Sequence, residues 1–468
     1  MESARMRFLF STLQHVESDF YGRVGRNLRR QGHDIAHLTY SRRAAQVLRR
    51  RGDQAYCLPD LMAEVEPLGS WREEEARIVD RYPIPSLHEV YRTDPPCRDE
   101  SDEAWCVERT VRHFLAIEAL FERLDPEVVV PEVGNESIRT VSHLVATADG
   151  ATTLFLMYTI FDRPLRLYAD TMDAPIVAQD ELRALAPEEG AELDDFIARY
   201  TERNRPIRDY RRVTVDLHRF HMLGRHLLVR SLWDRSNDYL TPGAWVARDM
   251  REMARSRLAR PLYSPEPVEQ RFVYFPLHVV DDYKILRLRP HCVDQESIIT
   301  QVANALPPGL ELVIKEHPMS IGRNPVSMLR RLARLPNIRL VEPHTSSLGL
   351  IRRSAGVATI SSTVGLEALL YDKPVLTLGR PFYAGYGVTL DISDFGQIRD
   401  RVPELLEFTP DRERTRRFLH AAMRHCYPGA PVLVDRSDDN ASTLATTLDR
   451  AARGELGDRH NLARTPAA

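Results

Sequence analysis

Short apolar runs alternate with amphipathic stretches along much of the chain. The first apolar run covers residues 7–11, and after a polar turn a helical pattern ends at Gly32 and leads into a second apolar run over 35–40. Strands buried on both faces of a parallel sheet are apolar throughout, whereas helices that cover such a sheet repeat every 3.6 residues. The order strand, helix, strand therefore predicts a βαβ unit, with ligands at the carboxyl ends of its strands.

The same alternation predicts a second group of elements before a helical region. Residues 128–130 read as a strand, followed by a loop over 131–137, a helix to about 146 and a strand over 153–158. From about 188 to 260 the pattern is helical and strongly charged. It ends in a proline-rich stretch over 260–270, which interrupts regular structure and marks a domain boundary.

Beyond this boundary the alternation resumes. Strands are predicted over 272–275, 312–315, 338–341, 357–360 and 375–378, with helices near 295–305, 325–335, 348–353, 364–371, 411–425 and 441–453. We therefore expect an α/β protein with two Rossmann-type, doubly wound domains that face a cleft. The expected units are an N-terminal acceptor-side domain over 1–260 with a helical insertion, a C-terminal nucleotide-sugar-binding domain over 271–435, and a helix and tail over 436–468.

Composition excludes several classes. The 468 residues are 43% hydrophobic, enough for a sizeable core, and carry 64 basic against 67 acidic residues, so the field of a general nucleic-acid binder is missing. No apolar stretch is long enough for a membrane span, and the N-terminus lacks a signal-peptide pattern. The five cysteines are scattered, which argues against a disulfide framework or structural zinc. We expect a cytoplasmic protein.

A Lys-Glu-His-Pro sequence follows the apolar run over 312–314. Pro318 ends the strand and keeps the preceding residue extended, so His317 is expected to point off the sheet edge, with Lys315 beside it. An imidazole in that place can donate to a phosphate oxygen. The alternative is a histidine that caps a loop.

A run of hydroxyl side chains follows the strand over 357–360 and opens a helix. Ser361, Ser362 and Thr363 meet unpaired backbone amides there, which favours either an anion site or simple capping. Gly365 is expected to allow close approach of a ligand. Glu367, one turn further, is positioned to accept hydrogen bonds from ribose hydroxyls.

Two further segments lie at strand ends of the same predicted sheet. The loop over 379–389 contains three glycines and three aromatic residues, and Arg380 supplies charge, so it is either a ligand-binding loop or a surface Ω-loop. His278 follows the strand over 272–275 and adds a second histidine at the same edge. Two of the three lysines of the chain, Lys315 and Lys373, lie within or next to these segments.

These motifs resemble those of a known family. Lys-Glu-His-Pro at 315–318, Ser-Ser-Thr at 361–363 and the loop over 379–389 are similar to the bacterial capsule polysaccharide biosynthesis proteins, which include retaining β-Kdo transferases of GT-B fold. The His-Pro and Ser-Ser/Thr motifs are also similar to those of bacterial sialyltransferases. The resemblance implies a CMP-sugar site with His317 and the three hydroxyls at 361–363 around the phosphate. The family's usual Gly-Trp-Gly is Gly-Tyr-Gly at 385–387 here.

The carboxylate that such chemistry needs is expected in the N-terminal half. A retaining reaction by double displacement requires a nucleophile and an inverting one requires a base. The loop over 131–137 offers Glu136, our first choice, and Glu132; a plain helix N-terminal acid is the alternative for Glu136. His15, Glu17 and Asp19 are candidate acceptor contacts or ordinary loop residues.

The sequence thus predicts a glycosyltransferase that moves an acidic, Kdo-like ulosonate from a CMP-activated donor to a glycan, glycolipid or small-molecule acceptor. We expect no cofactor and no metal, and interpret the Asp-Asp pairs at 194–195, 281–282 and 438–439 as solvated surface. The alternatives are a UDP-sugar transferase or epimerase, a non-catalytic assembly factor for polysaccharide synthesis, and a small-molecule-modifying transferase. The basic stretch over 42–51 is either a contact for anionic lipid, as peripheral membrane association would need, or a solvated helix face.

Overall fold

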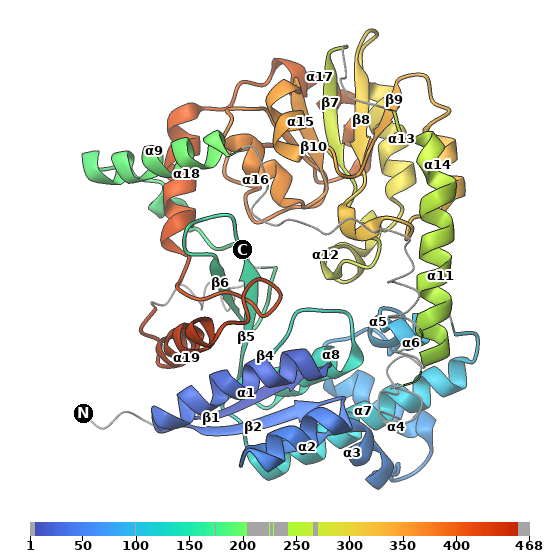
Figure 1. The fold of residues 1–468 in the computed structure, drawn as a ribbon, viewed down its shortest axis with the longest axis vertical. Coiled ribbons are helices and arrows are strands. Elements are labelled where there is room, and N and C mark those ends of the chain that lie inside the picture. The colour runs from blue at the N-terminus through green and yellow to red at the C-terminus, as the bar shows by residue number, and fades with distance from the viewer. Residues whose placement is uncertain are drawn as a thin grey trace.

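Two six-stranded sheets organise the computed structural model (Figure 1). It describes residues 5–456 except 99, 174, 204–223, 225–227, 229–241 and 265–269. The N-terminal sheet has the order β3-β2-β1-β4-β5-β6 and the C-terminal sheet the order β12-β11-β10-β7-β8-β9. All pairings are parallel except that of β5 with β6. The prediction of two Rossmann-type domains in a GT-B-like arrangement is confirmed.

In the N-terminal domain the strands predicted over 7–11, 35–40, 128–130 and 153–158 are confirmed, whereas the strand and the helices between 54 and 124 were not predicted. The strands are β1 Arg7–Thr12, β2 Asp34–Thr39, β3 Gln54–Cys57, β4 Val128–Pro131, β5 Thr152–Tyr158 and β6 Leu165–Ala169; the helices are α1 His15–Arg30, α2 Arg42–Arg50, α3 Leu58–Glu64, α4 Trp71–Arg81, α5 His88–Tyr91, α6 Pro95–Arg98, α7 Glu103–Leu124 and α8 Ser137–Ala148. Along β1, Phe8 and Phe10 pack on the side of α1, whereas Leu9 packs on the side of α7 and α8. Burial on both faces explains the continuous apolar runs.

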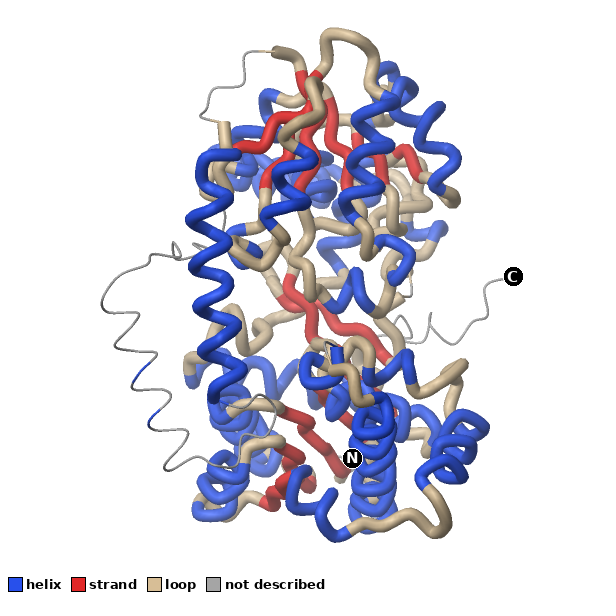
Figure 2. Tube along the Cα trace, turned by 90° about the vertical axis from the view of Figure 1, so that its right-hand side faces the viewer, coloured by secondary structure: helices blue, strands red, loops and turns tan. Residues whose placement is uncertain are grey.

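The C-terminal domain repeats this construction. Its strands are β7 Phe272–Pro276, β8 Glu311–Lys315, β9 Ile338–Val341, β10 Gly356–Thr359, β11 Val375–Thr377 and β12 Leu390–Asp391; its helices are α12 Tyr283–Leu286, α13 Gln295–Ala305, α14 Val326–Leu332, α15 Ser347–Arg353, α16 Thr363–Leu369, α17 Ile398–Glu407 and α18 Arg412–Arg424. Val273 and Phe275 face one core, and Phe272 and Tyr274 face the other. Figure 2 shows the strands of the two sheets in separate upper and lower parts, with helices around them.

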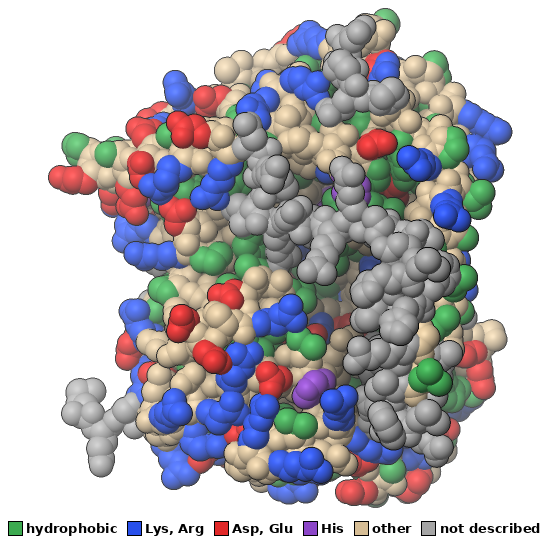
Figure 3. Space-filling model, viewed as in Figure 1, with side chains coloured by type: hydrophobic (Ala, Val, Ile, Leu, Met, Phe, Trp, Pro, Cys, Tyr) green, Lys and Arg blue, Asp and Glu red, His purple; other side chains and the backbone are tan. Residues whose placement is uncertain are grey.

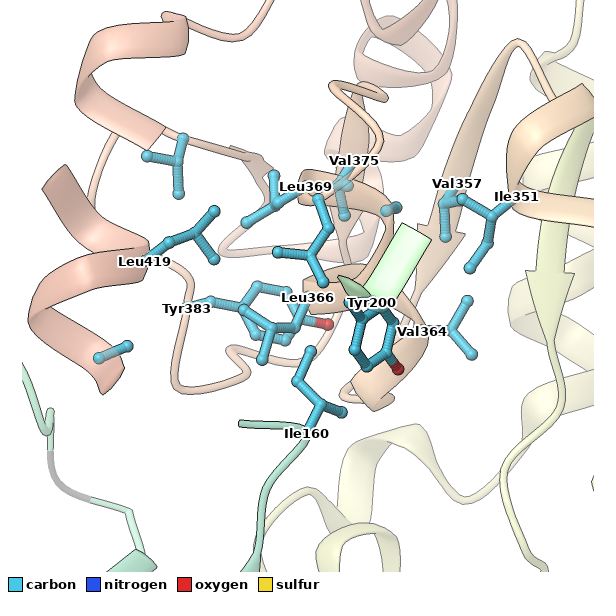
Figure 4. Close-up of a cluster of buried hydrophobic side chains, with 14 of the residues drawn as sticks. Ile160, Tyr200, Ile351, Val357, Val364, Leu366, Leu369, Val375, Tyr383 and Leu419 are labelled. Atoms are coloured by element: carbon cyan, nitrogen blue, oxygen red, sulfur yellow. The ribbon is translucent and has the colours of Figure 1, made fainter. Parts of the chain in front are cut away.

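Segments cross between the two domains. Helix α9 Pro187–Glu202 packs on α18, and α11 Pro242–Ala259 packs on α14, so both contact the C-terminal domain although the predicted N-terminal domain extended to 260. Figure 4 shows Tyr200 and Ile160 among the side chains of the C-terminal core. In the opposite direction, α19 Asp438–Ala452 covers α1 of the N-terminal domain. The exact domain boundaries stay a prediction.

Strand β6, which forms an antiparallel hairpin with the predicted strand β5, is an element that the sequence did not predict. In β6, Leu165, Leu167 and Ala169 pack toward α1 and α19, whereas Arg166 and Tyr168 lie on the other face. Leu-Arg-Leu-Tyr-Ala is a period-2 pattern and was the available signal. The face of β6 that carries Arg166 and Tyr168 lies at the boundary between the domains.

Candidate functional site

A cavity of about 520 Å³ lies between the two domains. One wall comes from the hairpin of β5 and β6 and the loop after it, and the other from loops that follow β7, β10 and β11. Its lining includes Met157, Tyr158, Arg166, Tyr168, Met172, Asp173, Tyr283, Lys284, Arg289, Ser361, Thr363, Arg380, Phe382, Tyr383 and Tyr386. The C-terminal wall is therefore at the carboxyl ends of parallel strands, where open α/β sheets bind ligands. Of the predicted site residues, Ser361, Thr363 and Arg380 are in this lining.

The three hydroxyl residues at the start of α16 have different roles. Ser362 is the N-cap, because its Oγ accepts a hydrogen bond from the Val364 amide at 3.2 Å. Ser361 and Thr363 instead line the cavity. Simple capping thus accounts for one hydroxyl and leaves two facing the open space, in the place predicted for a phosphate.

His278 binds the backbone of this segment. Strands β7 and β10 are neighbours, and the Ser361 amide donates to His278 Nε2 at 3.1 Å. Burial lowers the pKa of His278 to about 4, so the imidazole is neutral near pH 7, and an accepting Nε2 assigns its proton to Nδ1. His278 therefore orients Ser361 and is absent from the cavity lining.

The Lys-Glu-His-Pro segment is largely tied to the protein itself. Lys315 is buried and its Nζ donates to the Pro343 carbonyl at 3.2 Å, and Glu316 accepts hydrogen bonds from Tyr263 and Asn324. His317 caps the short turn that begins at Pro318, accepting from the Met319 amide through Nδ1 at 3.2 Å. The capping alternative is thus observed. Because Nδ1 accepts, a neutral His317 carries its proton on Nε2.

The space beside Gly365 that was predicted for a ligand is filled by the side chain of Tyr383. A Cβ at this position would lie 2.1 Å from Tyr383 Oη. Tyr383 is buried and donates to the Ser362 carbonyl at 2.5 Å, which fastens the loop over 379–389 to the start of α16. The glycine is needed for this packing.

Glu367 also has a protein partner. The Tyr200 hydroxyl, from α9, donates to Glu367 Oε1 at 2.7 Å. Burial raises the pKa of Glu367 to about 7, and the charge of Lys315 opposes this shift. A tyrosine hydroxyl therefore occupies one of the acceptor positions expected for ribose, and Glu367 is outside the cavity lining.

Arg380 lies in a left-handed conformation with φ 49°. This conformation is unfavourable for a residue other than glycine, asparagine or aspartate and needs support from its surroundings. Arg289 provides it by donating to the carbonyls of Gly379 and Arg380, the latter at 3.0 Å, while also pairing with Asp173. The Arg380 side chain itself is exposed at the cavity and pairs with no carboxylate in the described chain.

Lys284 is a second cation at the cavity that the sequence analysis did not place in the site. It lies at the start of α12, where its backbone amide donates to Asp282, and its ammonium forms no ion pair within the described residues. The available signal was its position after the strand over 272–276, as one of only three lysines. Lys284 and Arg380 thus bring unpaired positive charge to the wall that carries Ser361 and Thr363.

The N-terminal carboxylates gather at the ends of β1 and β4, which are parallel neighbours. Arg139 Nη2 donates to Glu17 at 2.8 Å, and Arg139 Nη1 lies 3.1 Å from Glu136, so a single guanidinium serves two carboxylates. Glu132 accepts from the buried hydroxyl of Tyr21. Glu132 and Glu136 are therefore brought together as expected, with Glu17 added to them.

Burial sets the protonation of this cluster. It raises the pKa of Glu132 to about 7, with repulsion from Glu17 adding to the effect and Arg139 opposing it; it also raises the pKa of Glu136. Asn135, between the two, donates to the Asp281 carbonyl at 2.7 Å and so links this loop to the C-terminal domain. Glu132, unlike an exposed glutamate, can hold or release a proton near neutral pH.

The remaining predicted residues lie elsewhere. Asp19 pairs with Arg51 at 2.6 Å, and Arg42 of the basic stretch pairs with Asp60, so these arginines are partly neutralised. Across the described residues no group of three or more His, Cys, Asp or Glu side chains is arranged to hold a metal ion. No helix in that part of the chain is long and apolar enough to cross a membrane.

Two Rossmann-type domains with a cavity between them are the architecture of the GT-B fold. Similar solved structures include Staphylococcus aureus MnaA with UDP (13% identity, TM-score 0.32, covering 96% of this chain and 97% of that one). Another is Thermosulfurimonas dismutans KpsC, a β-Kdo 2,7 transferase (16% identity, TM-score 0.32, covering 69% and 88%). The strand order, rather than these low scores, supports the fold assignment.

Residues 234–409 match the model of the capsule polysaccharide biosynthesis protein family, which confirms the resemblance for this part of the chain. Protein FixF of Sinorhizobium fredii is 31% identical over 166 residues, 35% of this chain and 40% of FixF. The capsule polysaccharide modification protein LipA of Neisseria meningitidis serogroup B is 28% identical over 158 residues, 32% of this chain and 21% of LipA. The matches thus span less than half of these relatives.

We predict that Gly365→Ala destabilises the protein. The new methyl group must displace the Tyr383 hydroxyl from its hydrogen bond, at a cost of about 1–3 kcal/mol. Gly190→Ala in α9 is the matched control: its nearest neighbour would be 3.6 Å away, so it should stabilise the helix by about 0.5–1 kcal/mol. Urea denaturation measures both, and equal effects of the two substitutions would contradict this account of Gly365.

We predict that Glu132→Gln changes how stability depends on pH. Because burial raises the folded-state pKa to about 7 from 4.5, the wild-type contribution of Glu132 is fully present below pH 4.5 and is lost as pH rises to about 7. Relative to wild type, the variant should gain up to about 3 kcal/mol between pH 4.5 and 8. Urea denaturation at both pH values tests this, with exposed Glu122→Gln as control; equal pH profiles for all three proteins would refute it.

Proposed function

We propose that this protein is a glycosyltransferase that transfers an acidic, ulosonate-type sugar from a CMP-activated donor to a glycan, glycolipid or small-molecule acceptor. The observation that carries the proposal is the interdomain cavity whose C-terminal wall combines the unpaired charges of Lys284 and Arg380 with the hydroxyls of Ser361 and Thr363. The family match over 234–409 supports capsule-type glycan chemistry. The donor, acceptor and reaction outcome are all part of the proposal.

The cationic wall suits the leaving group of such a reaction. When the bond between the anomeric carbon and the phosphate breaks, CMP departs and its phosphate gains negative charge. Donors that are held in place before the reaction stabilise this charge more in the transition state than in the ground state. Lys284, Arg380 and the two hydroxyls would provide them. His317 is outside the cavity lining, and its place among these donors rests on the resemblance of its His-Pro motif.

The carboxylate cluster, which is outside the cavity lining, would supply the remaining groups. Burial raises the pKa of Glu136 and the charge of Arg139 opposes this shift, so Arg139 would have to hold Glu136 ionised for it to act as a nucleophile or a base, whereas Glu132 with its pKa near 7 suits proton transfer. Glu136 Oε2 is buried and accepts no hydrogen bond, although it lies 3.1 Å from Arg139. This scheme uses no metal and no resident cofactor.

Nucleotide selectivity tests the donor class. We expect CMP and a CMP-sugar to raise the melting temperature of the purified chain, because binding to the folded state at 100 times Kd stabilises it by about 2.7 kcal/mol. UDP, dTDP and their sugars at equal concentrations serve as comparison and should produce no shift. Stabilisation by UDP or dTDP without stabilisation by CMP would show that the donor assignment is wrong.

We predict that His317→Ala lowers turnover about a hundredfold, since removal of one donor to a developing charge typically costs about 3 kcal/mol. Release of CMP from a CMP-sugar in the presence of a panel of acceptors is the measurement. His291→Ala, a substitution of an exposed histidine on the same domain, is the control and should keep wild-type turnover. Near-normal turnover by a folded His317→Ala variant would remove His317 from the mechanism.

A further inference from the structure

Arg166 is a buried arginine in the N-terminal wall of the cavity. It lies on the β6 strand, paired in register with Met157 of β5, and its exposed fraction is 3%. Leu165 and Leu167, its strand neighbours, face the core under α1 and α19. Arg166 therefore faces the opposite direction, where it lines the cavity.

Its guanidinium lacks an anionic partner. No carboxylate of the described chain pairs with Arg166, and its Nε and Nη2 atoms are buried without a hydrogen-bond acceptor. The centroid of the Phe382 ring lies 3.6 Å from its guanidinium carbon, and its other polar neighbours are the uncharged side chains of Tyr168 and Cys426. A ring face attracts the cation but satisfies none of its in-plane N–H groups.

Other buried arginines of the described chain all have partners. Arg109 lies beside Asp94 and donates to the Tyr40 hydroxyl, Arg139 pairs with Glu17, and Arg289 pairs with Asp173. An unpaired buried charge is costly, so it is retained where a ligand supplies the opposite charge. The chain has thus left one buried guanidinium open at the boundary of its cavity.

The position of Arg166 indicates which anion it receives. Phe382 belongs to the same loop as Arg380, so the stacked guanidinium lies close to the wall that carries Arg380, Ser361 and Thr363. The cavity therefore has a cation on each wall: Arg166 on the N-terminal wall and Arg380 on the C-terminal wall. A ulosonate bears its carboxylate on the anomeric carbon, the carbon that also bears the phosphate. One small ligand of this kind presents two anionic groups to the two walls.

We propose that Arg166 binds the carboxylate of the transferred sugar and so selects acidic over neutral sugars. This assignment rests on the proposed function for the identity of the donor, and on the unpaired guanidinium for the binding group. A planar guanidinium fixed on an aromatic ring presents two parallel N–H groups to a carboxylate. A neutral sugar would leave those groups buried and unsatisfied.

Titration calorimetry on the full chain tests the assignment with paired ligands. The ligands are CMP, CMP-Kdo, UDP-glucose and UDP-glucuronate, and the proteins are wild type, Arg166→Met, Arg166→Lys and, as control, Arg163→Met. Arg163 is exposed on the same hairpin and outside the cavity lining. Methionine keeps an apolar side chain against Phe382 and removes only the charged group.

In Arg166→Met we expect the Kd for CMP-Kdo to rise about 10- to 100-fold, the loss typical of a hydrogen bond to a charged group, with the Kd for CMP changed less than about twofold. Arg163→Met should match wild type. If Arg166→Met fails to fold, Arg166→Lys carries the comparison, with a smaller but selective loss because lysine lacks the planar fork. An equal loss for CMP and CMP-Kdo, or no loss for either, would overturn the assignment.

The uridine ligands separate this proposal from the proposed function. If wild type binds UDP-glucuronate and no cytidine ligand, the CMP donor is wrong. A selective loss of UDP-glucuronate over UDP-glucose in Arg166→Met then supports a carboxylate site at Arg166 but overturns its position beside the anomeric carbon, because glucuronate carries its carboxylate on C5. If wild type binds neither acidic nucleotide sugar, both proposals fail. A variant that binds donors normally but requires more acceptor would assign Arg166 to an acceptor and overturn its role at the donor.

Discussion

Burial of ionic side chains between the two domains constrains the structure more than any other feature, because an ion removed from water requires an opposite charge or a set of hydrogen bonds. Arg289 illustrates the satisfied case. It pairs with Asp173 from the loop after β6 and donates to two carbonyls of the loop after β11. This contact joins the domains and supports the left-handed Arg380. The cations that line the cavity without carboxylate partners stand out against such pairs.

The two domains are also interlocked by exchanged segments. Tyr200 of α9 reaches Glu367 in the C-terminal domain, and α19 returns the chain to α1 of the N-terminal domain, where His33 pairs with Asp449 at 2.8 Å. Each domain therefore completes its surface with a segment from the other half of the sequence. A ligand that contacts both cavity walls acts on a pair of domains already joined at several points, which reduces the ordering that binding requires.

The sequence predicted the parts of the fold in which local pattern and burial agree. The strands buried on both faces were apparent from continuous apolar runs, such as 128–130 and 312–314. The β6 strand was missed because Arg166 and Tyr168 interrupt its apolar run, and they do so because they face the cavity. The positions that break the pattern are thus the ones whose side chains line the cavity.

In the candidate site, too, the sequence predicted only what depends on local pattern. Ser361, Thr363 and Arg380 follow strand ends and could be predicted from the parallel-sheet rule, whereas the partners of His278, Gly365 and Glu367 come from distant parts of the chain. Those three residues were expected to face a ligand. Instead, His278 accepts a hydrogen bond from the Ser361 amide, Gly365 leaves room for Tyr383, and Glu367 accepts a hydrogen bond from Tyr200.

The near-neutral net charge of −3 is consistent with this arrangement, and Figure 3 shows basic and acidic side chains interspersed over the visible face. Without a strong field over the whole surface, an anionic ligand is held by short-range groups, which are effective because the cavity removes them from water. Division of these groups between two walls has a further consequence. Under the proposed assignment, a nucleotide alone would contact only the C-terminal cations, whereas a ligand with a second anion would also contact Arg166 and so bridge both domains.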